Sequence, residues 1–386
     1  MLITDDEGVI VDLGFPEDLA QRFPDLHVER LQGLLVPGFI NTHCHLELSC
    51  MKGQITRHTG MAGFVSEFVS KRAAFTDQER AAAIVKAEDE MLRNGTVAVG
   101  DISNGNSTFS QKAKKRLYYQ TFIETFDLAP SRAPEAFDRA CLLREELIDL
   151  MPETRHQVSI VPHAPYTVSP ELHKLIATYA RRHQLLLSIH NQESRAEDEL
   201  FRTGTGKLME MYERMGLDYS WFKARGESSI HSTLPFYKDN DKLLLVHNTY
   251  TAEDDLLFAA GAETKASRQK PLLFWATCPN ANLYIEDRLP NYTALLKHNL
   301  RITIGTDSLA SNSTLSVLDE LKTVAHAHPE IPVDVLLRWA TLNGAEFLGI
   351  DRQYGSFEMG KKPGVALIEG AGPLAFSGGW TSRRIL

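Results

Sequence analysis

The chain has 386 residues, of which 43% are hydrophobic, and it carries a formal net charge of −9. This length and hydrophobic content favour one large domain with a small appendage, and the acidic balance argues against nucleic acid as a partner. Because there is no long apolar run and no signal-peptide pattern at the start, we expect a cytoplasmic protein that does not bind membranes. The four cysteines are not in paired spacing, so we expect free thiols.

Short apolar or β-branched runs alternate with longer amphipathic stretches from about Gly33 to about Ala310. This alternation is typical of βα units around a parallel sheet. Eight such runs predict a closed (β/α)₈ barrel, an α/β fold. In chain order the predicted strands are Leu34–Leu46, Thr96–Ser103, Leu117–Asp127, Gln157–Val168, Leu185–His190, Lys242–Asn248, Leu272–Ala276 and Arg301–Asp307.

Local signals mark helices between and after these strands. Thr76 and Glu79 form a capping box before AAAIVKAEDEMLRNG, and Asn94-Gly95 should end that helix. The pair Ser169-Pro170 should open the helix ELHKLIATYARRH. After the eighth strand, STLSVLDELKTVAHA and VDVLLRWATLNGAEFLG are each predicted to form a helix.

The two chain ends are predicted to form a second, smaller unit. The segment GSFEMGKKPGVALIEG indicates a turn followed by a strand that has no place in a closed barrel. We expect this strand to pair with Gly8–Gly14 near the N-terminus. The predicted division is a small β subdomain made of residues 1–36 and 355–386, and a barrel made of residues 37–354.

Five of the fourteen histidines stand at or just after the end of a predicted strand: His43, His45, His163, His190 and His247. Active sites of this fold lie at the carboxyl ends of the strands. His43 and His45 are two apart, so both rings should project from the same side of the strand, inward if Cys44 points outward. This spacing suits two ligands on one cation. The alternative, two core or solvated histidines, is disfavoured by the other strand-end histidines.

Two acids are candidates for chemistry at the same face. Asp307 follows an apolar strand, where a buried carboxylate needs a positive partner such as a cation held by imidazoles; the alternative is a helix N-cap. Glu193 stands three residues after His190 and could carry protons beside the metal; the alternative is a surface glutamate. His43, His45, His190 and Asp307 would form a mixed nitrogen and oxygen site with a position open for water, whose pKa a bound zinc lowers to about 7.

Seven ordered motifs resemble the amidohydrolase superfamily, in particular its chlorohydrolase and aromatic deaminase branch, which includes deaminases of adenosine derivatives and of aminofutalosine. The resemblance covers nearly the whole chain and agrees with the predicted barrel. The motifs are LLVPGFINTHCHLELS (34–49), VPHAPYTVS (161–169), SIHNQES (188–194), LVHNTY (245–250), CPNANLYI (278–285), GTDSLASNSTLSVLDEL (305–321) and ATLNGAEFLG (340–349).

The resemblance implies a single divalent metal ion, with zinc as the expected metal and iron as the alternative. Branches with two metals usually place a modified lysine after the fourth strand, but VPHAPY contains no lysine. One metal is therefore the prediction, and the implied ligands are His43, His45, His190 and Asp307.

The resemblance also implies roles in catalysis. His247 would orient the attacking water, Asp307 would take its proton, and Glu193 would shuttle protons to the ring nitrogen and the leaving group. His163 would contact the substrate. Water adding to an amidine carbon builds negative charge on the adjacent nitrogen, and protonation there by a carboxylic acid is typically worth 10²- to 10⁴-fold in rate.

The favoured function is hydrolytic deamination of an aminated nitrogen heterocycle, purine- or nucleoside-like, with release of ammonia. The alternatives are hydrolysis of an amide, a cyclic amide or a carbon–halogen bond at the same mononuclear site and, more remotely, a non-catalytic assembly protein. We expect a small-molecule substrate and a homodimer. The aromatic segment Gly216–Lys238 is predicted to be either a lid or pocket wall, or an irregular excursion that packs its own side chains.

Overall fold

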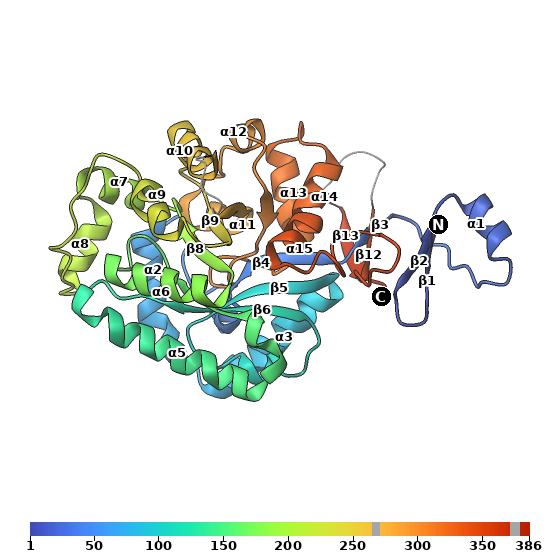
Figure 1. Ribbon diagram of the computed structural model, residues 1–386, viewed down its shortest axis with the longest axis horizontal. Helices are drawn as coiled ribbons and strands as arrows, with labels where there is room; N and C mark the ends of the chain where they lie inside the picture. Colours follow the sequence, from blue (N-terminus) through green and yellow to red (C-terminus); the bar gives the residue numbers. More distant parts are fainter. Residues whose placement is uncertain (265–270, 371–378) are drawn as a thin grey trace.

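The computed structural model describes residues 1–264, 271–370 and 379–386. Its main body is built on eight parallel strands, arranged as two four-stranded sheets in the orders β4-β5-β6-β7 and β11-β10-β9-β8 (Figure 1). The strands are β4 Phe39–Cys44, β5 Thr96–Ser103, β6 Tyr118–Thr125, β7 Val158–Pro162, β8 Leu187–Asn191, β9 Lys242–His247, β10 Leu272–Thr277 and β11 Ile302–Ile304.

Hydrogen bonds join the two sheets at both seams. Between β7 and β8, the amide of His190 donates to the carbonyl of His163 at 2.9 Å. Between β11 and β4, the amides of Thr306 and Asp307 donate to the carbonyl of His43 at 3.0 and 3.1 Å. The eight strands thus form the predicted (β/α)₈ barrel, and the same bonds bring four of the candidate site residues to its two seams.

The end of the barrel where the strands begin is filled with apolar side chains. Phe347 of α15 (Leu342–Leu348) lies against Phe122 and Phe274 of the barrel strands, with ring centroids 6.2 and 5.4 Å apart. Lys242, the first residue of β9, donates to the carbonyl of Glu346. α15 thus covers the end where the strands begin, and the candidate site residues lie at the carboxyl ends of the strands, where active sites of this fold are found.

The helices cover the outside of the barrel and extend its mouth. The predicted capping box of Thr76 and Glu79 opens α3, and Asn94 caps its end with Gly95 at φ +92°. Pro170 opens α6 as predicted. The helices are α2 Gly60–Lys71, α3 Asp77–Arg93, α4 Phe109–Lys112, α5 Ala133–Leu150, α6 Pro170–His183, α7 Arg195–Thr203, α8 Lys207–Arg214, α9 Ser229–Thr233, α10 Glu253–Thr264, α11 Pro279–Glu286, α12 Tyr292–Lys297 and α13 Val317–Ala327.

The last predicted helix is in fact two. The stretch VDVLLRWATLNGAEFLG forms α14 (Val333–Ala340) and α15, separated at Thr341, whose φ and ψ are −133° and −88°. The break allows Gly344 to lie against Ile40 and Thr42 of β4, where a Cβ would come within 2.8 Å of the isoleucine side chain. Close packing against the barrel therefore overrides the continuous helical pattern of the sequence.

The pairing predicted for the chain ends is wrong in its partner. The late strand β12 (Val365–Glu369) pairs antiparallel with β3 (Leu34–Pro37) and with β13 (Thr381–Arg384), not with Gly8–Gly14. The first predicted strand is accordingly divided between β3 and β4, and Gly38 allows the close approach because a Cβ there would come within 2.2 Å of Val97. The division into residues 1–36 plus 355–386 and residues 37–354 stays a prediction.

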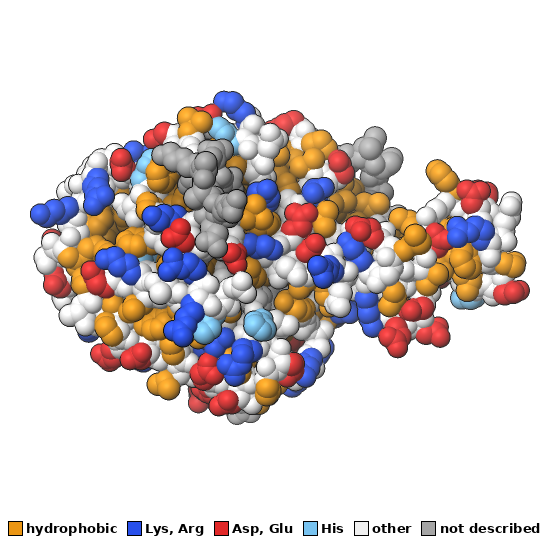
Figure 2. Space-filling view, viewed as in Figure 1, with side chains coloured by type: hydrophobic (Ala, Val, Ile, Leu, Met, Phe, Trp, Pro, Cys, Tyr) orange, Lys and Arg blue, Asp and Glu red, His pale blue; other side chains and the backbone are white. Residues whose placement is uncertain are grey.

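The N-terminal segment forms a projecting arm of β1 (Leu2–Thr4), β2 (Ile10–Leu13) and α1 (Pro16–Arg22), which lies beside the C-terminus (Figure 1). Ile10 exchanges backbone hydrogen bonds with Gly360 and Lys361 at 2.9 and 2.8 Å. Phe15 on this arm is 77% exposed, and orange apolar surface is visible there in Figure 2. The two ends do meet, as predicted, but through this hairpin contact.

Two further predictions concern the chain as a whole. Cys44, Cys50, Cys141 and Cys278 are all free thiols, as expected. Within the described ranges, no helix has both the length and the apolar character needed to cross a membrane.

Candidate metal centre and active site

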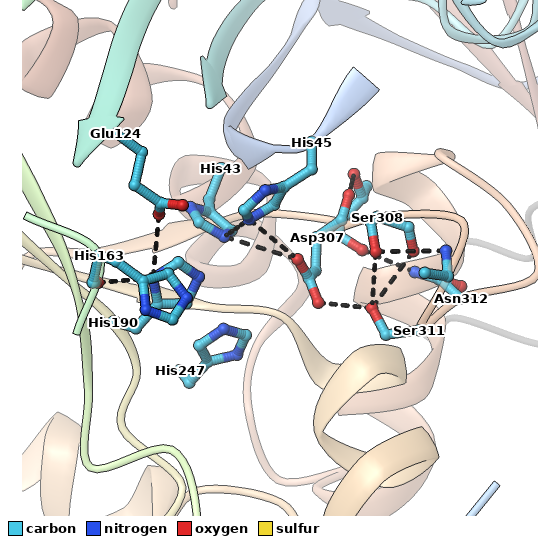
Figure 3. Close-up of polar contacts among 12 residues, drawn as sticks. His43, His45, Glu124, His163, His190, His247, Asp307, Ser308, Ser311 and Asn312 are labelled. Carbon is cyan, nitrogen blue, oxygen red and sulfur yellow. Dashed lines mark hydrogen bonds and ion pairs between the residues drawn. The ribbon is translucent and has the colours of Figure 1, made fainter. Parts of the chain in front are cut away.

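Four of the predicted site residues, His43, His45, His190 and Asp307, converge at the mouth of the barrel (Figure 3). His43 lies in β4 and His45 follows it, and their Nε2 atoms are 3.2 Å apart. Cys44 points the other way, into an apolar cluster with Ile84 and Met91 of α3. The alternation of the strand therefore turns both imidazoles inward, as predicted.

Asp307 lies beside the same two rings. Its Oδ1 is 3.6 Å from His43 Nε2 and 3.4 Å from His45 Nε2, while its Oδ2 accepts a hydrogen bond from Ser311. The next helix, α13, begins after the N-cap Ser316, so Asp307 caps no helix. The alternative interpretation of this aspartate is thereby excluded.

His190, at the end of β8, completes the cluster. Its ring centroid is 4.9 Å from that of His43 and 5.5 Å from that of His45, and each of the three rings offers a nitrogen within 4.8 Å of the others. His190 Nδ1 lies 2.8 Å from the carbonyl of His163. That carbonyl can only accept, so Nδ1 carries the proton and Nε2 keeps a lone pair, the tautomer that a metal ligand needs.

His247 stands at the end of β9 in a strained backbone conformation. Its φ is +74° and that of Asn248 is +58°, a region that residues other than glycine rarely adopt. Asn248 holds the turn by donating from Nδ2 to the carbonyls of Leu245 and Ala276 at 2.8 and 3.0 Å. Gln192 and Asp307 also have positive φ, so the strain gathers at the mouth, as is common at functional sites.

Burial sets the protonation of the imidazoles. Desolvation lowers the pKa of His45 to about 3 and the pKa values of His163 and His247 to about 4. The pKa of His190 lies well below its usual range for the same reason, with the neighbouring histidines adding to the effect. At neutral pH these rings are uncharged, and a neutral imidazole is the form that binds a metal.

The two candidate acids differ in their electrostatics. Burial alone would raise the pKa of Asp307, but the nearby rings of His43, His45 and His247 hold it below the usual range. Glu193 is also buried, and desolvation together with the charge of Asp307 raises its pKa well above the usual range. Its Oε1 lies 3.4 Å from His247 Nε2. Glu193 is therefore no surface carboxylate.

Glu124, at the end of β6, is a site residue that the sequence interpretation missed. Its Oε1 lies 3.6 Å from His190 Nδ1, its Oε2 accepts from Asn104 Nδ2 at 2.8 Å, and burial raises its pKa to about 7. The signal was available in FIETFD, because an acid that closes an apolar strand is the same pattern that singled out Asp307. Asn282 is another residue that was left without a role, and its carbonyl Oδ1 accepts a hydrogen bond from His247 Nδ1 at 2.8 Å.

His163 follows β7 and is only partly buried, with its ring centroid 4.7 Å from that of His190. Its Nδ1 contacts Thr167 Oγ1 at 2.7 Å. Of the histidines left without a role, His58 lies 3.5 Å from Asp287 and His298 lies 2.8 Å from Glu253, both in ion-pair contacts away from the cluster.

The donor set fits a divalent cation. His43, His45 and His190 contribute imidazole nitrogens and Asp307 a carboxylate oxygen, which is the ligand chemistry of catalytic zinc. Nε2 of His247 is a buried nitrogen without a hydrogen-bond partner among the described residues. A second possible group, His43 with His247 and Asp307, shares two members with the predicted set, so a cation at this place would lie within reach of all these side chains.

The segment Gly216–Lys238 packs onto the mouth. Trp221 Nε1 donates to the carbonyl of Leu128 at 2.7 Å, and Tyr219 is buried in a cluster with Tyr166 and Tyr212. Ser228 and Ser229, further along, donate to buried carboxylates of α10 and α7. These contacts show that the segment does not pack only its own side chains, and its role as a lid or pocket wall stays a prediction.

Together, the barrel and the convergent imidazoles and carboxylates at its mouth define a (β/α)₈ hydrolase. The profile of the amidohydrolase family matches residues 34–383, and the chain belongs to this family. It is a hydrolase that acts on carbon–nitrogen bonds.

The relatives agree with the branch that the motifs indicated. The aminodeoxyfutalosine deaminase of Deinococcus radiodurans is 27% identical over 344 residues, which cover 87% of this chain and 78% of the relative. The structure of Helicobacter pylori aminofutalosine deaminase in complex with methylthio-coformycin matches with a TM-score of 0.82 and 24% identity, covering 97% of this chain and 88% of that one. Relatives of this chain are thus deaminases of adenosine derivatives.

A zinc-containing structure is also similar in fold. Atrazine chlorohydrolase from Arthrobacter aurescens, complexed with zinc, matches with a TM-score of 0.71 and 19% identity, covering 95% of this chain and 81% of that one. The same fold thus occurs in a structure named as a deaminase and in one named as a chlorohydrolase. The fold alone does not decide between deamination and dehalogenation.

Proposed function

We propose that the protein is a hydrolytic deaminase of an aminated purine, purine nucleoside or closely related heterocycle. The observation that carries the proposal is a buried carboxyl group, Glu193, whose pKa is held well above its usual range 3.4 Å from a neutral imidazole, His247. A carboxyl group whose pKa is raised in this way holds its proton more tightly than usual, and it can donate that proton to a ring nitrogen while water adds to the adjacent carbon.

The proposed cofactor is one divalent cation, zinc in preference to iron, with His43, His45, His190 and Asp307 as its ligands. When bound, it supplies Lewis acidity that makes water nucleophilic near neutral pH. The carbonyl of His163 fixes the tautomer of His190, and the Ser311 hydroxyl fixes the rotamer of Asp307. Such supporting hydrogen bonds orient ligands before the metal arrives.

The remaining side chains have separate proposed tasks. Asp307, whose low pKa keeps it ionised, takes the proton of the attacking water. Glu193 gives its proton to the ring nitrogen and afterwards carries a proton to the leaving amine, so that ammonia departs and a carbonyl remains. His247 orients the water and polarises the carbon under attack, with its ring fixed by Asn282. His163, the partly exposed histidine at the rim, contacts the substrate.

The test is a leaving-group comparison on one ring system. Protein loaded with one equivalent of zinc is incubated with adenosine, 5′-substituted adenosines, adenine, guanine and aminopterins, and with 6-chloropurine riboside. Ammonia release with replacement of the amino group by oxygen, detected by mass spectrometry in ¹⁸O-labelled water, is the expected result. Chloride release without ammonia from any amino compound would favour the carbon–halogen alternative, and hydrolysis of amides alone would favour the amide alternative.

Three predictions about the whole protein accompany this proposal. A small molecule is its substrate, as for the relatives. The cytoplasmic location and the homodimer stay predictions. Sedimentation of the purified protein would test whether it is a homodimer.

A further inference from the structure

The buried carboxylate of Glu197, in the first turn of α7, binds the backbone that carries Glu193. Its Oε1 accepts from the amide of Gln192 at 3.0 Å, and its Oε2 accepts from the amide of Glu193 at 3.0 Å. Ser229 Oγ donates to Oε1 at 2.5 Å. Because three donors occupy its two oxygens and its side chain is fully buried, Glu197 has no free oxygen to offer a substrate.

The backbone at this place requires such support. Gln192 has φ +46°, a left-handed conformation that is unfavourable for a residue with a Cβ. This bend follows β8 directly and turns the chain so that the Glu193 carboxyl lies 3.4 Å from His247 Nε2. A relaxed bend would move Glu193 away from the position that its proposed role requires.

A second set of contacts ties the same bend to the loop after β9. The backbone carbonyl of Gln192 accepts from the amide of Tyr250 at 2.9 Å, and the side-chain Oε1 of Gln192 accepts from Thr251 Oγ1 at 2.8 Å. Its Nε2 donates to the buried carboxylate of Asp255 at 2.7 Å. The loops that carry Glu193 and His247 are thus held as one unit, with Glu197 on one side of the bend and Asp255 on the other.

We infer that Glu197 is a positioning residue for catalysis, which acts by holding the amides of Gln192 and Glu193 so that the Glu193 carboxyl stays opposite His247. The inference rests on the proposed role of Glu193. Two backbone N–H groups require two acceptor oxygens at fixed positions, which a glutamate provides and a glutamine does not. Burial raises the pKa of Glu197 to about 7, and the hydrogen bonds from Ser229 and from the two backbone amides oppose that rise because they favour the ionised carboxylate.

The test uses the zinc-loaded protein with the variants Glu197→Gln, Glu197→Asp and, as a matched control on the same helix, the exposed Glu199→Gln. Glu197→Gln keeps the shape but loses one acceptor, and Glu197→Asp keeps the charge but shortens the reach. Both should lower kcat by roughly 10- to 100-fold, as expected for a displaced reacting group, with zinc content and KM little changed. Glu199→Gln should match the wild type.

A double-mutant cycle separates positioning from general support of the fold. If Glu197 acts through Glu193, Glu197→Gln should cost nothing further once Glu193→Gln is present. An equal loss in both backgrounds, or an unchanged kcat in Glu197→Gln, would overturn the inference. If Glu193→Gln alone leaves turnover intact, the proposed function of Glu193 fails, which is a different result.

Hydrogen exchange gives a readout that needs no activity. The amides of Gln192 and Glu193 should exchange roughly tenfold faster in Glu197→Gln, since one carboxyl oxygen that accepts from them is replaced by an amide nitrogen that cannot accept. Amides of β9 should not change. Equal exchange in wild type and Glu197→Gln would refute the positioning role of Glu197 even if no substrate is found. If the glutamine variant does not fold, the same measurement is made on Glu197→Asp.

Discussion

The two sides of the barrel mouth treat a buried carboxyl group in opposite ways. Asp307, at the seam of β11 and β4, is surrounded by imidazoles that hold its pKa below the usual range. Glu193, after β8, is close to other acids, and burial and their charges raise its pKa well above the usual range. Burial is similar at the two sites, 6% exposure in each case, so the neighbours decide which group is a ligand and which is an acid.

The largest effect is expected from Asp307→Asn. The amide keeps the shape but cannot supply the negative charge that balances a divalent cation, so bound zinc and turnover should both fall to background. Metal analysis after dialysis measures the first and the ammonia assay measures the second. A variant that retains a full equivalent of zinc would show that Asp307 is not a ligand, and the contrast between Asp307 as a ligand and Glu193 as an acid would not hold.

Glu193→Gln should impair proton transfer without impairing metal binding, unlike Asp307→Asn. Glutamine keeps the shape and burial but has no titratable proton, so turnover should fall by roughly 10²- to 10⁴-fold, mainly in kcat. Zinc content, measured on the same preparation, should remain at one equivalent. Loss of zinc in this variant would make Glu193 a ligand, and unchanged turnover would remove its role as an acid.

A smaller effect is expected from Ser311→Ala, which removes the hydroxyl that donates to Asp307 Oδ2. Loss of such a supporting hydrogen bond typically costs 10- to 100-fold in metal affinity. Competition with a fluorescent zinc chelator measures the affinity. Turnover at saturating zinc should stay close to that of the wild type; a large loss there would mean that Ser311 contacts the substrate or the water instead.

The smallest effect is a difference in how stability depends on pH in the metal-free protein. The raised pKa of Glu193 means that the folded state binds its proton more tightly, so above the unfolded pKa of about 4.3 the wild type should lose stability relative to Glu193→Gln as pH rises. Asp307 has a lowered pKa, so its contribution is present above about pH 3.9 and is lost as pH falls through its folded pKa, which Asp307→Asn should abolish.

Urea unfolding at several pH values measures both trends. One group contributes a slope of at most about 1.4 kcal/mol per pH unit. The comparison uses only the change of each difference with pH, which removes any constant effect of the substitution. Parallel curves for wild type and Glu193→Gln between pH 5 and 8 would show that the Glu193 pKa is not raised.

The barrel and the ligand candidates could be predicted from the sequence alone, for a local reason. In parallel strands the direction of each side chain follows from its position in the run, and all carboxyl ends meet at one face. His43, His45, His190 and Asp307 could therefore be placed together from strand ends alone, and the structure brings them together. Capping at Thr76 and Pro170 was equally local and is confirmed.

Contacts between distant segments decided the rest. The partner of β12 is β3 rather than Gly8–Gly14, because both candidates are short strands and only the packed barrel determines which lies alongside. The opposite pKa directions of Asp307 and Glu193 depend on neighbours supplied by other strands, which no local pattern encodes. Glu197 is the clearest case: as the fourth residue after Glu193 on an amphipathic helix it is unremarkable in sequence, and only the left-handed bend at Gln192 turns two backbone amides toward its oxygens.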